Sequence, residues 1–217
     1  MRLHVHRWGS GPTVALIHGG VLGGREAWRA QRPLTERWTL LAPDRPGRGM
    51  SPDARQDFEP EATLVADQLL GAPVHVVGYS YGAIVAMLAA AQRPQGVRTL
   101  TVVEPPATSV ARGVAAVDEW DAELRKPCAS SERGAGALVG ARPPGDADIR
   151  LGALAAAPFP MLVVSGGHME GYEAVCDAIA AGTGADRAVI RGGAHLVPDT
   201  GRPFNERLES FMTGVVP

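Results

Sequence analysis

Cysteine is scarce in this chain, which has only two among 217 residues, Cys128 and Cys176. The two form no close Cys-x-x-Cys pair, and no histidine or cysteine set has metal-ligand spacing, so we expect neither a disulfide framework nor a metal site. Reduced thiols are typical of the cytoplasm, and we expect the protein to reside there.

Long apolar runs and an excess of one charge are also missing. The N-terminus lacks the apolar stretch of ~7–15 residues found in secretory signals, and no segment reaches the ~18 apolar residues of a membrane-spanning helix. Lys and Arg total 21 against 23 Asp and Glu, a net charge of −2. We therefore expect a small-molecule substrate and no membrane or nucleic-acid partner; the oligomeric state stays open.

Aromatic residues make up 5% of the chain and hydrophobic residues 45%, so one sizeable core of mainly Ala, Val and Leu is expected in a single domain, residues 1–217. Short apolar runs alternate with longer amphipathic stretches, which predicts an α/β fold with a mainly parallel sheet covered by helices on both faces. The predicted strands are residues 2–8, 14–18, 39–43, 73–77, 97–103, 160–165 and 187–190. The predicted helices are residues 25–37, 61–70, 81–92, 172–181 and 202–212.

One long interval, residues 105–158, interrupts this alternation. It is rich in Ala, Gly, Pro and charged residues and contains no convincing strand. An insertion of this size is either a small helical lid or a partly mobile segment. We expect a short lid whose main helix covers residues 110–124 and includes Trp120.

The most informative motif is Gly-Tyr-Ser-Tyr-Gly at residues 78–82, directly after a predicted strand and at the start of a small-residue helix. A serine at the apex of such a turn has a strained backbone, and glycines two positions before and after it prevent collisions with the flanking elements. The turn lifts the Ser80 hydroxyl above the sheet edge and aims the first N–H groups of the helix at the same space. The motif predicts a nucleophile beside an oxyanion site.

Three further segments carry candidate functional residues where predicted strands end, the edge at which open parallel sheets bind ligands. The glycine-rich turn at residues 18–24 lets the backbone approach a reacting carbonyl. His195 lies in a glycine-containing loop after the last strand, where a general base is expected. Glu104 directly follows the strand at residues 97–103.

With these motifs, nearly the whole chain resembles the α/β-hydrolase family, from the turn at residues 18–24 through the serine turn to His195. The resemblance implies that Ser80 is the nucleophile, that His195 is the base, and that the backbone N–H groups of Gly20 and Tyr81 form the oxyanion hole. The residues themselves give the same roles, since a serine hydroxyl needs a base to take its proton and the tetrahedral intermediate needs N–H donors.

Several other residues are expected to have roles outside the reaction itself. His18 is expected to lock the glycine turn through a hydrogen bond. Asp44 and Ser51 belong to an Asp-x-x-Gly-x-Gly-x-Ser stretch that resembles a loop with a mainly structural role in the family. His168 is expected to be a loop or pocket-wall side chain.

The triad acid departs from the family pattern. It usually follows the strand at residues 160–165 in a Gly-x-x-Asp arrangement, but Met169 occupies the aspartate position here. Either Glu170, one residue later, takes over, or the acid is Glu104 at the end of the preceding strand. We favour Glu104, because a glutamate at a strand end next to the Ser80 strand starts near the histidine loop.

We expect a cofactor-free serine hydrolase that cleaves a small ester, lactone or thioester through an acyl-enzyme. One alternative is a non-hydrolytic enzyme of the same fold that performs carbon–carbon cleavage, elimination or cyclisation. Another is a small-molecule binding protein that has lost turnover.

Overall fold

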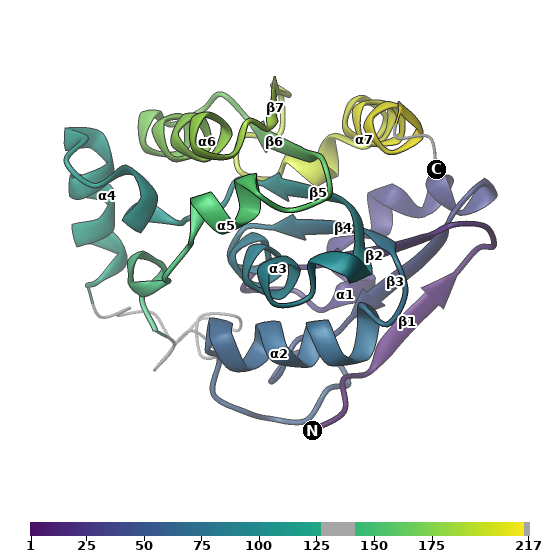
Figure 1. Ribbon diagram of the computed structural model, residues 1–217. Helices are drawn as coiled ribbons and strands as arrows, with labels where there is room; N and C mark the ends of the chain where they lie inside the picture. The colour runs from purple at the N-terminus through teal and green to yellow at the C-terminus, as the bar shows by residue number, and fades with distance from the viewer. Residues whose placement is uncertain (127–141, 215–217) are drawn as a thin grey trace.

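The computed structural model describes residues 1–126 and 142–214. At its centre is a seven-stranded sheet with the strand order β1-β3-β2-β4-β5-β6-β7 (Figure 1). The strands are β1 (Val5–Trp8), β2 (Thr13–Ile17), β3 (Thr39–Pro43), β4 (Val74–Tyr79), β5 (Val97–Val103), β6 (Met161–Ser165) and β7 (Asp186–Val189). The edge strand β1 pairs antiparallel with β3, and the other neighbouring pairs are parallel. The predicted mainly parallel sheet is therefore confirmed.

Helices cover both faces of this sheet, also as predicted (Figure 1). They are α1 (Gly24–Ala27), α2 (Phe58–Leu69), α3 (Tyr81–Gln92), α4 (Ala115–Leu124), α5 (Leu151–Ala155), α6 (Glu170–Thr183) and α7 (Arg202–Gly214). One core cluster packs α2, α3 and α6 against the sheet, and a second packs α1 and α7 against the opposite face. No helix in the described residues is both long and apolar enough to cross a membrane.

The two core clusters follow directly from the period of the strands. Side chains alternate between the faces of a strand, so consecutive residues enter different cores. In β6, for example, Val163 belongs to the cluster around α3, whereas Leu162 and Val164 belong to the cluster around α7. Strands buried on both faces are therefore almost continuously apolar, which is why they were recognisable in the sequence.

Two predicted helices were wrong in form. The helix expected over residues 25–37 ends at Ala27 and continues as a 3₁₀ helix, Arg29–Glu36. Pro33 lies inside this stretch, and proline lacks the N–H that an α-helix needs and disfavours α geometry in the preceding residue. The helix expected over residues 110–124 begins only at Ala115, because Gly113 has a φ of 90°.

The interval predicted as a lid, residues 105–158, contains α4 and α5 in its described parts; residues 127–141 lie outside the described residues. Helix α4 packs against α6, and α5 packs against α3 and α6 (Figure 1). The described part of the interval is thus joined to the helices that cover one face of the sheet.

Candidate active site

Ser80 stands at the sharp turn between β4 and α3, with φ 54° and ψ −129°. A Cβ atom on Gly78 would lie only 2.6 Å from the Cα of Ala83, and one on Gly82 would overlap the carbonyl oxygens of Ile17 and His18. Glycine at both positions is therefore required, as the sequence predicted. The turn brings the Ser80 side chain to the carboxyl edge of the sheet.

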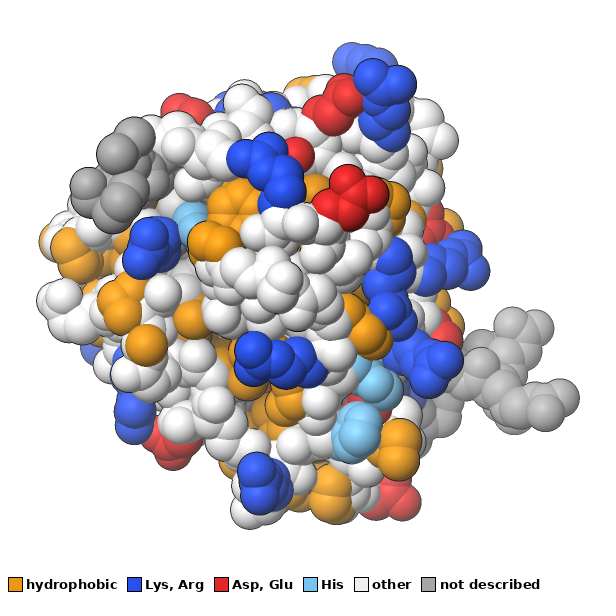
Figure 2. Space-filling model, turned by 90° about the vertical axis from the view of Figure 1, so that its right-hand side faces the viewer, with side chains coloured by type: hydrophobic (Ala, Val, Ile, Leu, Met, Phe, Trp, Pro, Cys, Tyr) orange, Lys and Arg blue, Asp and Glu red, His pale blue; other side chains and the backbone are white. Residues whose placement is uncertain are grey.

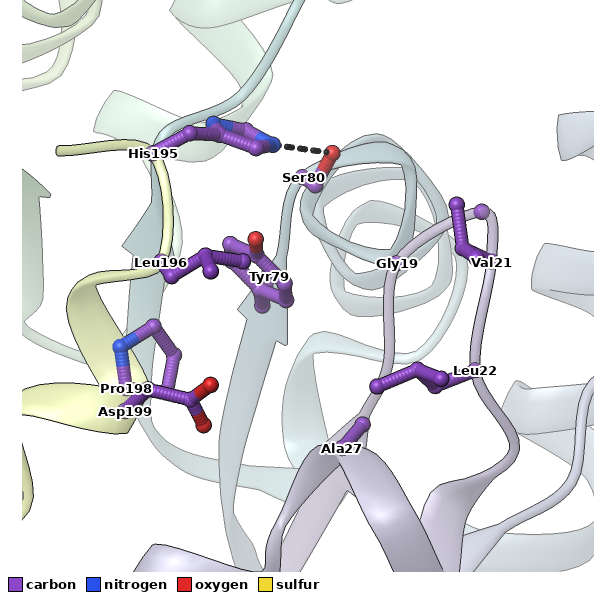
Figure 3. Close-up of a pocket in the computed structure, with 11 residues that line it drawn as sticks. Gly19, Val21, Leu22, Ala27, Tyr79, Ser80, His195, Leu196, Pro198 and Asp199 are labelled. Carbon is purple, nitrogen blue, oxygen red and sulfur yellow. Dashed lines mark hydrogen bonds between the residues drawn. The ribbon is translucent and has the colours of Figure 1, made fainter. Parts of the chain in front are cut away.

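A chain of hydrogen bonds connects Ser80 to a buried carboxyl group. His195 Nε2 lies 3.0 Å from Ser80 Oγ, and His195 Nδ1 lies 3.2 Å from Glu104 Oε2 (Figure 3 shows the Ser80 contact). The other oxygen of Glu104 accepts the N–H of Gly166. Because a carboxylate can only accept, the imidazole carries its proton on Nδ1 and leaves Nε2 free to accept from the serine.

The three residues come from separate parts of the sheet edge. Ser80 follows β4, Glu104 follows β5, and His195 lies in the loop after β7. Their backbones share an unusual feature: among the described residues, the only non-glycine residues with positive φ are Ser80 (54°), Glu104 (48°) and Ala194 (49°), the last next to His195. Such conformations cost about 1–3 kcal/mol each and tend to cluster at functional sites.

Of the two carboxylates considered from the sequence, Glu104 is brought to the histidine. Its side chain is fully buried, whereas Glu170 is exposed in the first turn of α6, where a negative charge is favourable. His168 also approaches the carboxylate, with Nδ1 3.7 Å from Glu104 Oε1.

The glycine turn at residues 19–24 is held from behind by charged side chains. Arg45 Nη1 donates to the carbonyl of Gly19 over 2.8 Å, and Arg48 donates to the carbonyl of Gly20. His18 Nε2 accepts the N–H of Arg45 over 2.9 Å, so its proton is on Nδ1, which donates to the Gly19 carbonyl. Burial, and then the charge of Arg45, lower the pKa of His18 to about 3, so this ring is neutral.

These contacts determine where one N–H group points. In a planar trans peptide, the N–H is directed opposite to the C=O. Since the Gly19 carbonyl is turned toward Arg45 and His18, the N–H of Gly20 in the same peptide is turned away from them. The expected locking role of His18 therefore has a geometric basis, whereas the contribution of Arg45 was not predicted.

Arg45 also reaches the other side of the site. Its guanidinium carbon lies 4.3 Å from the centre of the Tyr81 ring, and its Nε and Nη2 donate to Glu61 over 2.6 and 3.2 Å. The side chains of Arg45 and Glu61 are only 1% and 2% exposed. Arg45 of this buried ion pair thus contacts the Gly19 carbonyl, which shares a peptide with the Gly20 N–H, and also the ring of Tyr81.

A pocket of about 310 Å³ opens in front of Ser80 (Figure 3). Its lining is mostly apolar and consists of Gly19, Gly20, Val21, Leu22, Ala27, Tyr79, Ser80, His195, Leu196, Pro198 and Asp199. Val21, Leu22 and Leu196 are about half exposed, at 56%, 48% and 54%, and so give the pocket an apolar rim. Trp28, which follows α1, is fully buried in the core and does not line the pocket.

Two tyrosines beside the histidine were missed in the sequence. The ring centre of His195 lies 5.2 Å from that of Tyr79 and 4.9 Å from that of Tyr172. Tyr79 could have been found, because it precedes the serine in the motif, but nothing in the local pattern singles out Tyr172. Trp120 of α4 packs on Tyr172 at 4.2 Å and is not part of the pocket lining.

Comparison with known proteins agrees with this architecture. A family model described as "Alpha/beta hydrolase family" matches residues 14–208. A pimeloyl-[acyl-carrier protein] methyl ester esterase from Chromobacterium violaceum is 38% identical over 106 residues, 48% of this chain and 41% of that protein. Lipase LipV from Mycobacterium tuberculosis is 42% identical over 110 residues, again 48% and 41%. The matched part therefore spans less than half the length of these curated relatives.

Solved structures resemble nearly the whole chain. An esterase from Thermogutta terrifontis superimposes with a TM-score of 0.74 at 18% identity, over 98% of this chain and 93% of that one. The thioesterase domain from the curacin biosynthetic pathway gives a TM-score of 0.69 at 22% identity, over 94% of each chain. At these identities the likeness concerns the fold.

Proposed function

Because this chain belongs to the alpha/beta hydrolase family, we propose that it is a serine hydrolase that cleaves a small ester, lactone or thioester through an acyl-enzyme. The observation that carries the proposal is the hydrogen-bonded chain from Ser80 through His195 to the buried Glu104. Relatives named as esterases and a lipase support the same reaction class.

In the proposed reaction, Ser80 Oγ attacks the substrate carbonyl carbon while His195 Nε2 takes the hydroxyl proton. The carbonyl oxygen becomes an oxyanion, and the N–H groups of Gly20 and Tyr81 stabilise it. The bond to the leaving group then breaks, and the leaving alcohol or thiol receives the proton from His195. A water molecule repeats the sequence on the acyl-enzyme, which releases the acid and restores the serine. Glu104 holds the imidazole in the required tautomer and stabilises its charged form.

The rear contacts of the glycine turn support the assignment of Gly20 as a donor. An oxyanion donor is effective when it already points at the developing charge and needs no reorientation during the reaction. The hydrogen bonds from Arg45 and His18 to the Gly19 carbonyl prevent this peptide from turning over. A preorganised donor of this kind is the expected property of an acyl-transfer site.

The pocket supports a small and largely apolar substrate. Its volume of about 310 Å³ is at the lower end of the ~300–1,000 Å³ typical of ligand pockets. The apolar rim suits a short aliphatic acyl or alcohol group, which would lose contact with water on binding.

We also propose that residues 105–158 act as the lid of this single domain. The described link to the site is indirect and runs from Trp120 to Tyr172 and on to His195. Trp120→Ala should therefore change selectivity among acyl chains, measured as kcat/KM ratios. Equal losses for all esters together with a lower melting temperature would assign Trp120 to the core instead.

The proposed function is tested by covalent labelling. A fluorophosphonate should add one mass adduct to the wild type and to Ser10→Ala, an exposed-serine control, but none to Ser80→Ala. A panel of chromogenic esters with graded acyl chains should be hydrolysed by the wild type and the control only. An adduct and activity that survive in Ser80→Ala would refute the assignment.

The alternatives give different outcomes in the same experiments. A binding protein would show neither labelling nor turnover, yet a small molecule would raise its melting temperature. A non-hydrolytic enzyme would form a product without oxygen from isotopically labelled water. The contact between His195 and Glu104 supports hydrolysis over this alternative, because an oriented histidine can activate the water that hydrolyses an acyl-enzyme.

A further inference from the structure

Three side chains with metal-ligating atoms cluster beside the edge strand β1: His4, His6 and Asp44. Each offers one ligand atom, and these atoms all lie within 4.8 Å of one another. None of the three lines the pocket in front of Ser80. We propose that this cluster is a binding site for a divalent transition-metal ion, with Zn²⁺ as the first candidate.

The sheet itself brings the three residues together. Residues two positions apart in an extended segment point to the same face, so His4 and His6 lie side by side. Strands β1 and β3 are antiparallel with Val5 opposite Pro43, which places Asp44 opposite His4. The backbone N–H of Asp44 donates to the His4 carbonyl over 2.8 Å and continues the pairing. In Figure 2, histidine side chains lie next to each other at the surface, at the lower right of the view.

The spacing suits a tetrahedral ion. With zinc–ligand bonds of about 2.0–2.2 Å, neighbouring ligand atoms are about 3.4 Å apart. His6 Nε2 and Asp44 Oδ2 are already 3.1 Å apart, and the ring centres of His4 and His6 are 4.6 Å apart. The other ligand atoms lie no more than 4.8 Å apart, so the site has to contract by up to about 1.4 Å around the ion. Two imidazoles and one carboxylate are a donor set that zinc accepts, with water in the fourth position.

The proposed ligands are also held in place from behind. Asp44 Oδ1 accepts the N–H of Gly24 over 2.7 Å, and Oδ2 accepts the N–H of Met50 over 2.9 Å. The ring of His6 stacks on Trp8 with an interplanar angle of 5°. Outer contacts that orient the ligands in this way strengthen metal binding, because less freedom is lost when the ion arrives.

Metal at this position would be structural. It would join the edge strand to Asp44, the residue before Arg45, whose side chain holds the glycine turn of the active site. The ion would therefore stabilise the folded chain without taking part in the proposed ester cleavage. The inference does not rest on that function, because binding is measured in the absence of substrate.

The test is a titration of chelator-treated protein with ZnCl₂ by calorimetry, followed by a melting curve with and without the metal. We expect one site per chain and a melting temperature that rises with zinc concentration. His4→Ala and His6→Gln should each weaken binding by at least about 10-fold. The glutamine is chosen because its amide can still donate to Asp44. Arg7→Ala, which replaces the exposed residue after His6, on the opposite face of the strand, should bind like the wild type.

Co²⁺ provides a second readout that does not depend on stability. Bound in this site, it should give the strong visible absorption of a four-coordinate ion, and the bands should disappear in His4→Ala and His6→Gln. Absence of binding up to millimolar zinc would overturn the proposal. Wild-type affinity in both histidine variants would overturn it as well. If one variant fails to fold, the cobalt spectrum of the other decides.

Discussion

Replacing Glu104 by glutamine should stop turnover while leaving the fold intact. The carboxyl group has two partners, the N–H of Gly166 and Nδ1 of His195. In Glu104→Gln, the amide oxygen must face the N–H of Gly166. If the amide NH₂ faced Gly166 instead, two donors would oppose each other, and the unsatisfied buried N–H would destabilise the fold by about 1–3 kcal/mol. The amide NH₂ then faces Nδ1, which has to become an acceptor. The imidazole proton moves to Nε2, and that nitrogen can no longer accept the proton of Ser80.

The expected loss is large for one glutamate and small for the other. A histidine held in the wrong tautomer lowers kcat by about 10⁴-fold in related triads, equivalent to about 5 kcal/mol of activation free energy. Glu170 is exposed, and a surface substitution such as Glu170→Gln should change the free energy of unfolding by no more than about 0.5 kcal/mol. Its kcat should stay close to that of the wild type.

Both variants should be assayed for kcat on one activated ester at one pH, together with their melting temperatures. Near wild-type kcat in Glu104→Gln with a large loss in Glu170→Gln would refute the reasoning. Comparable small losses in both would mean that Ser80 and His195 work as a dyad. An unchanged melting temperature in Glu104→Gln would show that the loss arises from the tautomer and not from unfolding.

Three other perturbations test the surroundings of the site. Because burial and then Arg45 lower the pKa of His18 from 6.5 to about 3, the unfolded chain binds a proton that the folded chain excludes between these pH values. The free energy of unfolding should therefore fall as the pH decreases from 6.5 to 3, by up to about 1.4 kcal/mol per pH unit for this residue. In His18→Asn, the free energy of unfolding measured by urea titration at several pH values should fall less steeply with decreasing pH. Arg45→Lys should lower kcat by up to about 10²–10³-fold, the value of one oxyanion donor, and more than Arg48→Lys; equal effects at equal stability would contradict the peptide-orientation argument. Gly78→Ala should destabilise the protein by at least about 1–3 kcal/mol through overpacking, whereas Gly71→Ala, which has no atom within 4 Å of the added Cβ, should melt like the wild type.

The strands could be predicted from the sequence because each is a short apolar run between turn residues. The register and the order of the strands could not, since they depend on pairings between distant segments. The segment at residues 25–37 is different, because its departure from one α-helix has a local signal: Pro33 lies within the 3₁₀ helix and is visible in the sequence.

The candidate site was predictable where a residue directly ends a strand. Ser80 and Glu104 directly follow strands and could be placed at one edge, because parallel strands deliver their carboxyl ends together. His195 lies farther along the loop after β7 and was recognised by its place downstream of the serine turn. The contact of Arg45 with the glycine turn and that of Tyr172 with His195 depend on side chains crossing between elements, which no local pattern encodes. The spacing of residues along the chain predicted no metal site. It could not reveal the cluster of His4, His6 and Asp44, because Asp44 follows β3 and is far from the two histidines in sequence.

The place of Glu104 on β5 has a consequence for which strand can supply the acid. Strands β5 and β6 are parallel neighbours, about 4.8 Å apart, and Glu104 at the end of one already bonds the N–H of Gly166 at the end of the other. A carboxylate introduced at Met169 in the loop after β6 would approach the same imidazole nitrogen from the adjacent strand. Adding Met169→Asp to a Glu104→Gln variant would therefore test whether the neighbouring strand can supply the acid. The serine has no such alternative position, because the sharp turn that presents Ser80 connects β4 to α3.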